Sequence, residues 1–93
     1  MKRYAYIDNC SGFVWGLQDA TTPQQGAKQM DEELGASGRQ YDLTDGPAFS
    51  NETGYHVHVV PMDLDIADGQ DEDVIEVVSA LPYVGYLRVT ASA

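Results

Sequence analysis

Apolar and polar residues alternate in five stretches of the chain, and each stretch predicts a β-strand. The first two are residues 3–8 (RYAYID) and 13–20 (FVWGLQDA), which are rich in aromatic residues and are separated by the turn-forming residues NCSG. We expect them to pair as a β-hairpin over residues 3–19. The remaining strands are expected at 40–45 (QYDLTD), 55–60 (YHVHVV) and 83–91 (YVGYLRVTA).

A helical period replaces the alternation between residues 23 and 34. Thr22 is a good N-cap, Pro23 suits the first helical position, and Gln25 completes a capping box. Gly35 follows the helix, at a position where φ is often positive. The apolar face of this helix is predicted to hold Ala27, Met30 and Leu34.

A second helix is predicted over residues 73–81, where Val74, Val78 and Leu81 form one stripe before Pro82. The predicted order is therefore ββαββαβ. Without its first strand this order is βαββαβ, the split-βαβ, ferredoxin-like arrangement. We expect one α+β domain over residues 1–93, with an extra N-terminal strand and two helices on one face of a mainly antiparallel sheet.

The charge of the chain limits the partners that it can bind. Fifteen acidic residues stand against five basic ones, so the net charge is −10. Such a charge argues against direct binding to nucleic acid or to an anionic membrane, and it favours either a basic partner or simple solubility. A single cysteine allows no internal disulfide, and no apolar segment at the start suggests export, so a cytoplasmic location is expected.

The acidic residues are densest over residues 62–76, where no basic residue interrupts them. An EF-hand calcium loop is excluded, because neither alignment of the segment with the loop fits. With Gly69 at position 6 the first ligand position is Leu64, and with Glu76 at position 12 the third position is Ala67 and the sixth is Gln70. Three of the acids suit the start of the second helix, where they complement the helix dipole, and a fourth could cap it. The seven acids are Asp63, Asp65, Asp68, Asp71, Glu72, Asp73 and Glu76.

Helix capping leaves Asp63, Asp65 and Glu76 unexplained. In an extended segment Asp63 and Asp65 would point the same way, and acids on adjacent helical turns lie about 5–6 Å apart. Carboxylates at such distances could stand in for the phosphates of a nucleic-acid strand. The alternative that stays open is an ordinary solvated acidic face.

The predicted sheet carries a second candidate site. His56 and His58 lie two residues apart on one strand, and Tyr86 and Arg88 are predicted to share their open face. A zinc site would need a third ligand that no spacing supplies, so no metal and no cofactor are expected. The aromatic residues of the first hairpin either extend this face or are buried in the core. They are Tyr4, Tyr6, Phe13 and Trp15.

No catalytic motif occurs in the chain, so a binding protein is favoured over an enzyme. A small, strongly acidic, cysteine-poor chain without such motifs resembles the anti-CRISPR and anti-restriction inhibitors of the DNA-mimic type, which phages and mobile elements carry. The resemblance covers size, charge and the absence of motifs. It implies that the acids of residues 63–76 occlude a basic nucleic-acid-binding surface of a partner protein or complex.

A second hypothesis rests on the open sheet face. Ferredoxin-like chains of this length resemble the dimeric α+β barrel proteins, in which two sheets enclose a pocket. This resemblance implies an enzyme or small-ligand-binding homodimer whose pocket is lined by His56, His58, Tyr86 and Arg88.

Overall fold

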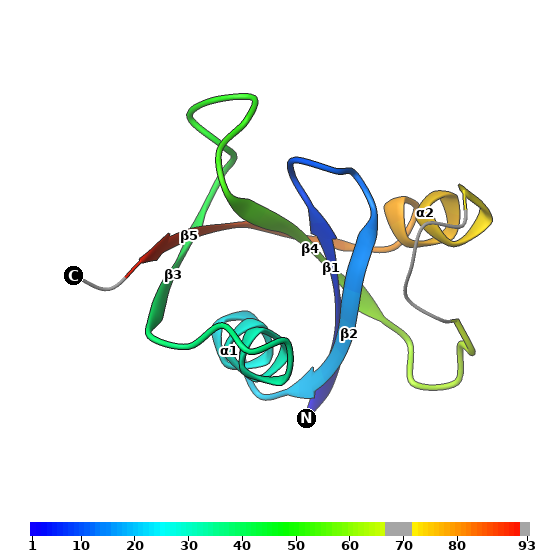
Figure 1. Ribbon diagram of the computed structural model, residues 1–93. Coiled ribbons are helices and arrows are strands. Elements are labelled where there is room, and N and C mark those ends of the chain that lie inside the picture. Colours follow the sequence, from blue (N-terminus) through cyan, green and yellow to red (C-terminus); the bar gives the residue numbers. More distant parts are fainter. Residues whose placement is uncertain (67–71, 92–93) are drawn as a thin grey trace.

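The computed structural model describes residues 1–66 and 72–91. It shows an α+β fold in which five antiparallel strands curve around one helix (Figure 1). The sheet has the strand order β2-β1-β4-β5-β3. Along the chain the elements are β1 (Lys2–Asp8), β2 (Val14–Ala20), α1 (Pro23–Glu33), β3 (Arg39–Thr44), β4 (Gly54–Val60), α2 (Glu72–Ser79) and β5 (Tyr83–Ala91).

The predicted order ββαββαβ is confirmed, and the antiparallel sheet is confirmed with it. The ferredoxin-like arrangement is not confirmed. A ferredoxin-like sheet would place β4 directly between β2 and β3, whereas here β1 separates β4 from β2 and β5 separates it from β3. The N-terminal strand is therefore an internal member of the sheet and not an addition at its edge.

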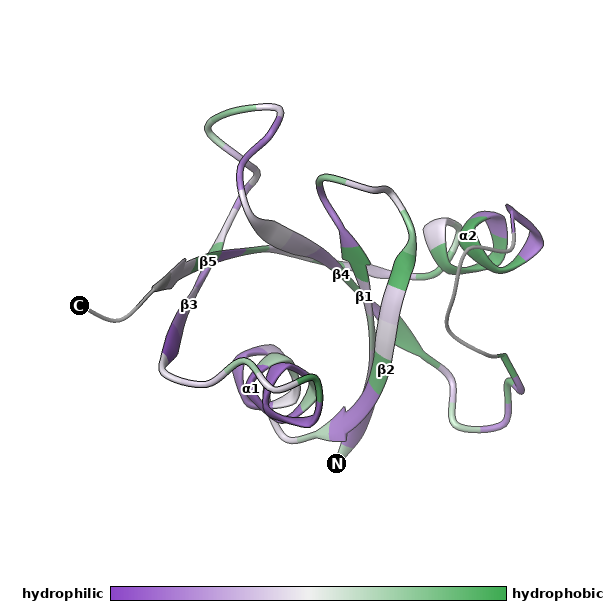
Figure 2. Cartoon of the chain, in the orientation of Figure 1, coloured by the Kyte–Doolittle hydropathy of each residue, from purple (hydrophilic) through white to green (hydrophobic). Residues whose placement is uncertain are grey.

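The two helices lie on opposite faces of the sheet, so the prediction that they share one face is wrong. α1 packs on the face that carries Tyr4 and Tyr6, and α2 packs on the face that carries Ala5 and Ile7. Neighbouring residues of a strand point to opposite faces, and all four of these residues of β1 are buried. Because β1 is buried on both sides, each face needs its own cover, and α1 and α2 lie on opposite sides of the sheet in Figure 2.

The ends of α1 confirm the residues that were expected to form them. The Thr22 hydroxyl accepts a hydrogen bond from the backbone N–H of Gln25 at 3.1 Å, and Gly35 has a φ of 87°. The Gln25 side chain accepts from the backbone N–H of Thr21 at 3.1 Å, one residue before the expected capping-box partner. Both ends are therefore set by local sequence.

Gly26 lies in the first turn of α1, where glycine lowers helix propensity. The reason for it is a close approach between the helix and β1. The Tyr6 hydroxyl donates to the carbonyl of Pro23 at 2.8 Å, and a Cβ on Gly26 would lie 2.1 Å from that hydroxyl oxygen. Glycine thus lets a fully buried tyrosine bond the start of the helix.

Candidate functional site

Two acids of the predicted partner-binding segment directly follow β4. Asp63 and Asp65 are exposed, while Leu64 and Ile66 pack into the core cluster beneath α2. A turn closes here, because the N–H of Leu64 donates to the carbonyl of Pro61 at 3.0 Å. Asp63 therefore lies within a turn and Asp65 lies just after it, so the two carboxylates do not project from one extended strand.

Three more of these acids lie on the outer side of α2. Glu72, Asp73 and Glu76 are exposed, while the apolar stripe of the helix faces the sheet. Glu72 and Asp73 occupy the first turn, as the helix-start interpretation predicted. Asp68 and Asp71 lie outside the described residues. We call the five described acids the acidic surface: Asp63, Asp65, Glu72, Asp73 and Glu76.

Three of the five basic residues of the chain form ion pairs inside the fold. Each joins one arginine to one acid outside the acidic surface: Arg3 to Asp19 at 2.9 Å, Arg39 to Asp31 at 3.5 Å, and Arg88 to Glu52 at 2.8 Å. The hydrogen bond and charge of Asp19 raise the pKa of Arg3, and the charge of Asp65 raises it further. These pairs place three of the five basic groups of the chain next to acids outside the acidic surface.

The second predicted site comes together on the face opposite α1, but it is not open. The rings of His56 and Tyr86 have centroids 5.0 Å apart. Tyr86 is fully buried, His58 is 7% exposed, and the Arg88 guanidinium is held by Glu52. The expectation of an open face is therefore wrong here, because the loop before β4 and the helix α2 border this part of the sheet.

The aromatic residues of the first hairpin divide between core and surface. Tyr4 and Tyr6 are buried beneath α1, on the face opposite His56 and Tyr86. Trp15 is 46% exposed. The interpretation that the hairpin buries its aromatic residues is thus confirmed for the two tyrosines and wrong for the tryptophan.

His56 sits in a hydrogen-bonded chain whose direction the neighbouring groups determine. The side-chain amide of Asn9 donates to the carbonyl of Glu52 at 2.9 Å, so its oxygen faces His56 Nε2 at 3.0 Å. Nε2 therefore carries the proton, and Nδ1 accepts from the Tyr83 hydroxyl at 3.2 Å. Burial lowers the pKa of His56, and the charge of His58 lowers it further.

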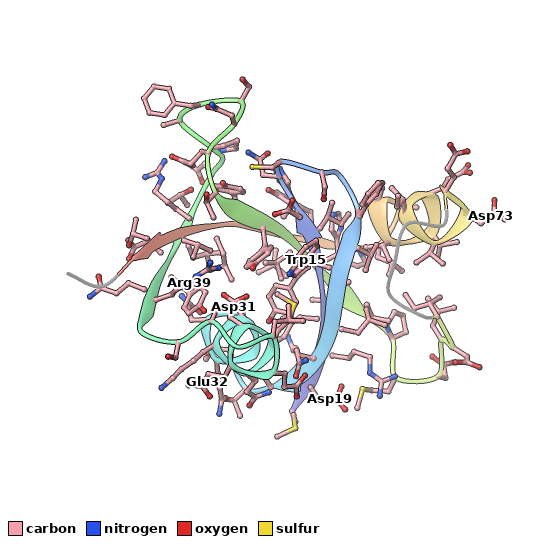
Figure 3. The ribbon with its side chains drawn as sticks, in the orientation of Figure 1. Trp15, Asp19, Asp31, Glu32, Arg39 and Asp73 are labelled. Atoms are coloured by element: carbon pink, nitrogen blue, oxygen red, sulfur yellow. The ribbon has the colours of Figure 1, made fainter. Side chains whose placement is uncertain are left out.

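A buried acid on α1 is the main polar feature that the sequence did not predict. Asp31 is 1% exposed, and its carboxylate accepts hydrogen bonds from Tyr55 at 2.7 Å and Tyr41 at 2.5 Å. Burial and the bond to Asp31 raise the pKa of both tyrosines. The network ties α1 to β3 and β4, and Arg39 completes it (Figure 3).

The helical period contained a sign of this network. Asp31 lies four residues after Ala27, so it belongs on the apolar stripe as much as Leu34 does. In the structure Asp31 takes that place, and Leu34 is 60% exposed. The stripe predicted from the sequence omitted Asp31, because acidic residues are rarely fully buried unless they are paired.

A cleft of about 340 Å³ opens beside this network. It lies where the C-terminal end of α1 meets the ends of β1, β2, β3 and β4, and its walls include Trp15, Tyr55 and Arg39. Two other hollows flank α1, with volumes of about 420 and 520 Å³, and their linings are dominated by polar side chains.

Comparison of the chain with protein-family models, with curated proteins and with solved structures found no match in any of the three. Among residues 1–66 and 72–91, no helix is long and apolar enough to cross a membrane.

Proposed function

We propose that this protein is a non-enzymatic binding protein whose acidic surface occupies a basic, nucleic-acid-binding surface of a partner protein or complex. The observation that carries the proposal is the distribution of charge. Three arginines are engaged by acids elsewhere in the fold, and all five residues of the acidic surface are exposed. A chain of net charge −10 thus presents carboxylates to solvent on the side of α2.

The arrangement on α2 supports recognition of a basic surface. Glu72 and Glu76 are four residues apart and Asp73 and Glu76 are three apart, so these side chains share one helical face, with Cβ atoms about 5–6 Å apart. Val74 and Val78 fix this face outward by packing against the sheet. Carboxylates presented along one helical face can meet the lysines and arginines that otherwise contact phosphates.

The mechanism of the proposal is competition. A protein that binds DNA or RNA through its backbone uses lysine and arginine contacts, and occupation of these groups by carboxylates displaces the nucleic acid. Charge complementarity acts mainly on the association rate and weakens with salt. This is the mode of inhibition implied by the resemblance to anti-CRISPR and anti-restriction inhibitors.

The α+β barrel hypothesis lacks a comparable observation. It requires a sheet face that a second subunit can cover. α2 already packs on β2 and β4 on that face, and both Tyr86 and His58 are buried within the single chain.

A charge-reversal pair of variants tests the proposal. The first variant changes Asp63, Asp65 and Glu76 to lysine and spares the first turn of α2. The control changes three exposed acids elsewhere to lysine. They are Glu32 on α1, Asp42 on β3 and Asp45 in the loop after β3. Both variants have the same net charge, so a difference between them reports the location of the acids.

The variants and the parent are used to capture proteins from a bacterial lysate, and each captured protein is assayed for nucleic-acid binding. We expect the parent and the control to retain a basic partner, to release it at high salt and to inhibit its nucleic-acid binding. The Asp63, Asp65 and Glu76 variant should lose both effects. Equal capture and inhibition by all three proteins would show that the acidic surface is only a solvated face.

A further inference from the structure

The cleft beside α1 has an aromatic wall that the fold turns toward solvent. Trp15 lies in an irregularity of the β1–β2 ladder, where Tyr6 pairs with Gly16 and Ile7 pairs with Val14. Trp15 is thus skipped by the pairing, and it is the only tryptophan of the chain. Bulges of this kind redirect a side chain, and they are frequent beside functional sites.

The residues on either side of Trp15 show why it is redirected. Val14 is buried in the cluster beneath α2, and Gly16 lies against Met30 of α1 so closely that a Cβ would be 2.5 Å from the Met30 sulfur. Two neighbours are thus committed to opposite faces of the sheet. The indole between them is left 46% exposed at the rim of the cleft.

The charges of the cleft favour a cation. Asp8 and Asp31 contribute two carboxylates and Arg39 contributes one guanidinium to its lining, in a molecule of net charge −10. Arg39 already forms an ion pair with Asp31 at 3.5 Å, so the guanidinium offsets the charge of Asp31 and not that of Asp8. The face of an indole is also electronegative and attracts ammonium and guanidinium groups.

The position of Asp8 is fixed. One of its carboxylate oxygens accepts the N–H of Ser11 at 2.8 Å, which holds the side chain at the turn between β1 and β2. Its strand neighbour in the ladder is Tyr55, whose ring borders the same cleft. An aromatic wall and a fixed carboxylate are therefore built into one hollow.

We propose that this cleft receives an arginine or lysine side chain of the partner, with Trp15 stacking on the cationic group and Asp8 supplying the opposite charge. The proposal rests on the proposed function, because it names a group that a basic nucleic-acid-binding partner presents. The cleft has a volume of about 340 Å³, at the lower end of the range of about 300–1,000 Å³ for ligand pockets, and this size suits a single side chain.

The sole tryptophan makes the test direct, because its fluorescence reports on the cleft. The parent protein is titrated with end-blocked tri-arginine, tri-lysine and tri-glutamate peptides at low and at physiological salt. We expect a saturable change in Trp15 fluorescence with the two basic peptides and none with tri-glutamate. Tighter binding of tri-glutamate would assign the cleft to an anion held by Arg39 and would overturn the proposal.

Two variants locate the binding by calorimetry. Trp15→Leu removes the aromatic face without changing the net charge, and we expect tri-arginine to bind about three- to tenfold more weakly. Asp8→Asn keeps an acceptor for Ser11 and removes the charge, so its loss of affinity should shrink at higher salt. Unchanged tri-arginine affinity in both variants, with unchanged melting temperatures, would refute the proposal.

The acidic-surface variant with lysine at 63, 65 and 76 separates this proposal from the proposed function. It should retain the fluorescence response to tri-arginine, because its substitutions lie on the other side of the sheet. Loss of partner capture by that variant together with undiminished tri-arginine binding by Trp15→Leu would leave the proposed function standing and remove the cleft from it. If the acidic-surface variant shows both a normal Trp15 response to tri-arginine and undiminished partner capture, the cleft proposal stands and the acidic surface is removed from the proposed function.

Discussion

Replacing Asp31 with alanine removes the acceptor that two tyrosine hydroxyls share between α1, β3 and β4. Hydrogen bonds to a charged group contribute about 1.5–3 kcal/mol each, and the carboxylate accepts one from Tyr55 and one from Tyr41. Tyr55 is 3% exposed, so its hydroxyl would lose its partner inside the core. The contact with Arg39 adds little, because the Arg39 side chain is 36% exposed and its guanidinium lies 3.5 Å from the carboxylate.

We therefore expect Asp31→Ala to lower the free energy of unfolding by about 3–6 kcal/mol, through the loss of two hydrogen bonds to a charged acceptor. Domains of this size have total stabilities of roughly 5–15 kcal/mol, so the variant should be close to unfolding at ambient temperature. In Asp31→Asn the side-chain carbonyl can still accept a hydrogen bond from one tyrosine hydroxyl, and the amide can donate one to the oxygen of the other. The free energy of unfolding should therefore fall less in this variant than in the alanine variant.

Equilibrium unfolding in urea, followed by circular dichroism, measures these differences. Glu32→Ala is the matched control, since Glu32 is the exposed neighbour on the same helix, and it should change stability by less than about 0.5 kcal/mol. A loss below 1 kcal/mol for Asp31→Ala, with the helix content of the parent, would refute the account of this network.

Two further predictions follow from local geometry. Gly26→Ala should destabilise the protein, because the contact of the new Cβ with the Tyr6 hydroxyl costs about 1–3 kcal/mol, against a gain of about 1 kcal/mol in helix propensity. The loss of stability should be smaller in a Tyr6→Phe background, which lacks the hydroxyl, and urea unfolding measures both effects. Folding lowers the pKa of His56, so the unfolded state binds a proton at this residue more readily than the folded state. The protein therefore keeps the full contribution of this residue to its stability at pH values above the unfolded pKa of about 6.5 and loses that contribution as the pH falls below that value. His56→Gln should remove that part of the acid destabilisation, and urea titrations at neutral and mildly acidic pH would contradict this if both proteins lost equal stability.

The secondary structure could be predicted because its determinants are local. Thr22 and Gly35 mark the ends of α1, and the alternation in residues 55–60 defines β4. The strand order depends on which faces of which strands need cover, and that information is spread over the chain. The sequence RYAYID contained a sign of it, since four successive apolar or aromatic residues suggested a strand buried on both sides.

The candidate site was predictable only in part, for a related reason. Exposure of the acids on α2 follows from helical period alone, as the inward Val74 and Val78 show. The burial of Asp31 depends on Tyr41 and Tyr55, which lie on two different strands and reach it only through the tertiary fold. The exposure of Trp15 depends on a one-residue register shift in the pairing of β2 with β1, and no local sequence pattern predicts that shift.

The edge strand β2 connects the two surfaces proposed for the partner. Val14 belongs to the cluster beneath α2, next to the acidic surface, and the adjacent Trp15 lines the cleft beside α1. One residue therefore separates the support of one surface from the wall of the other, although they lie on opposite faces of the sheet. β2 pairs only with β1, so its other side is not covered by a further strand in the described part of the chain. A partner that engages both surfaces must reach across this edge, with a basic surface on the side of α2 and a single basic side chain in the cleft.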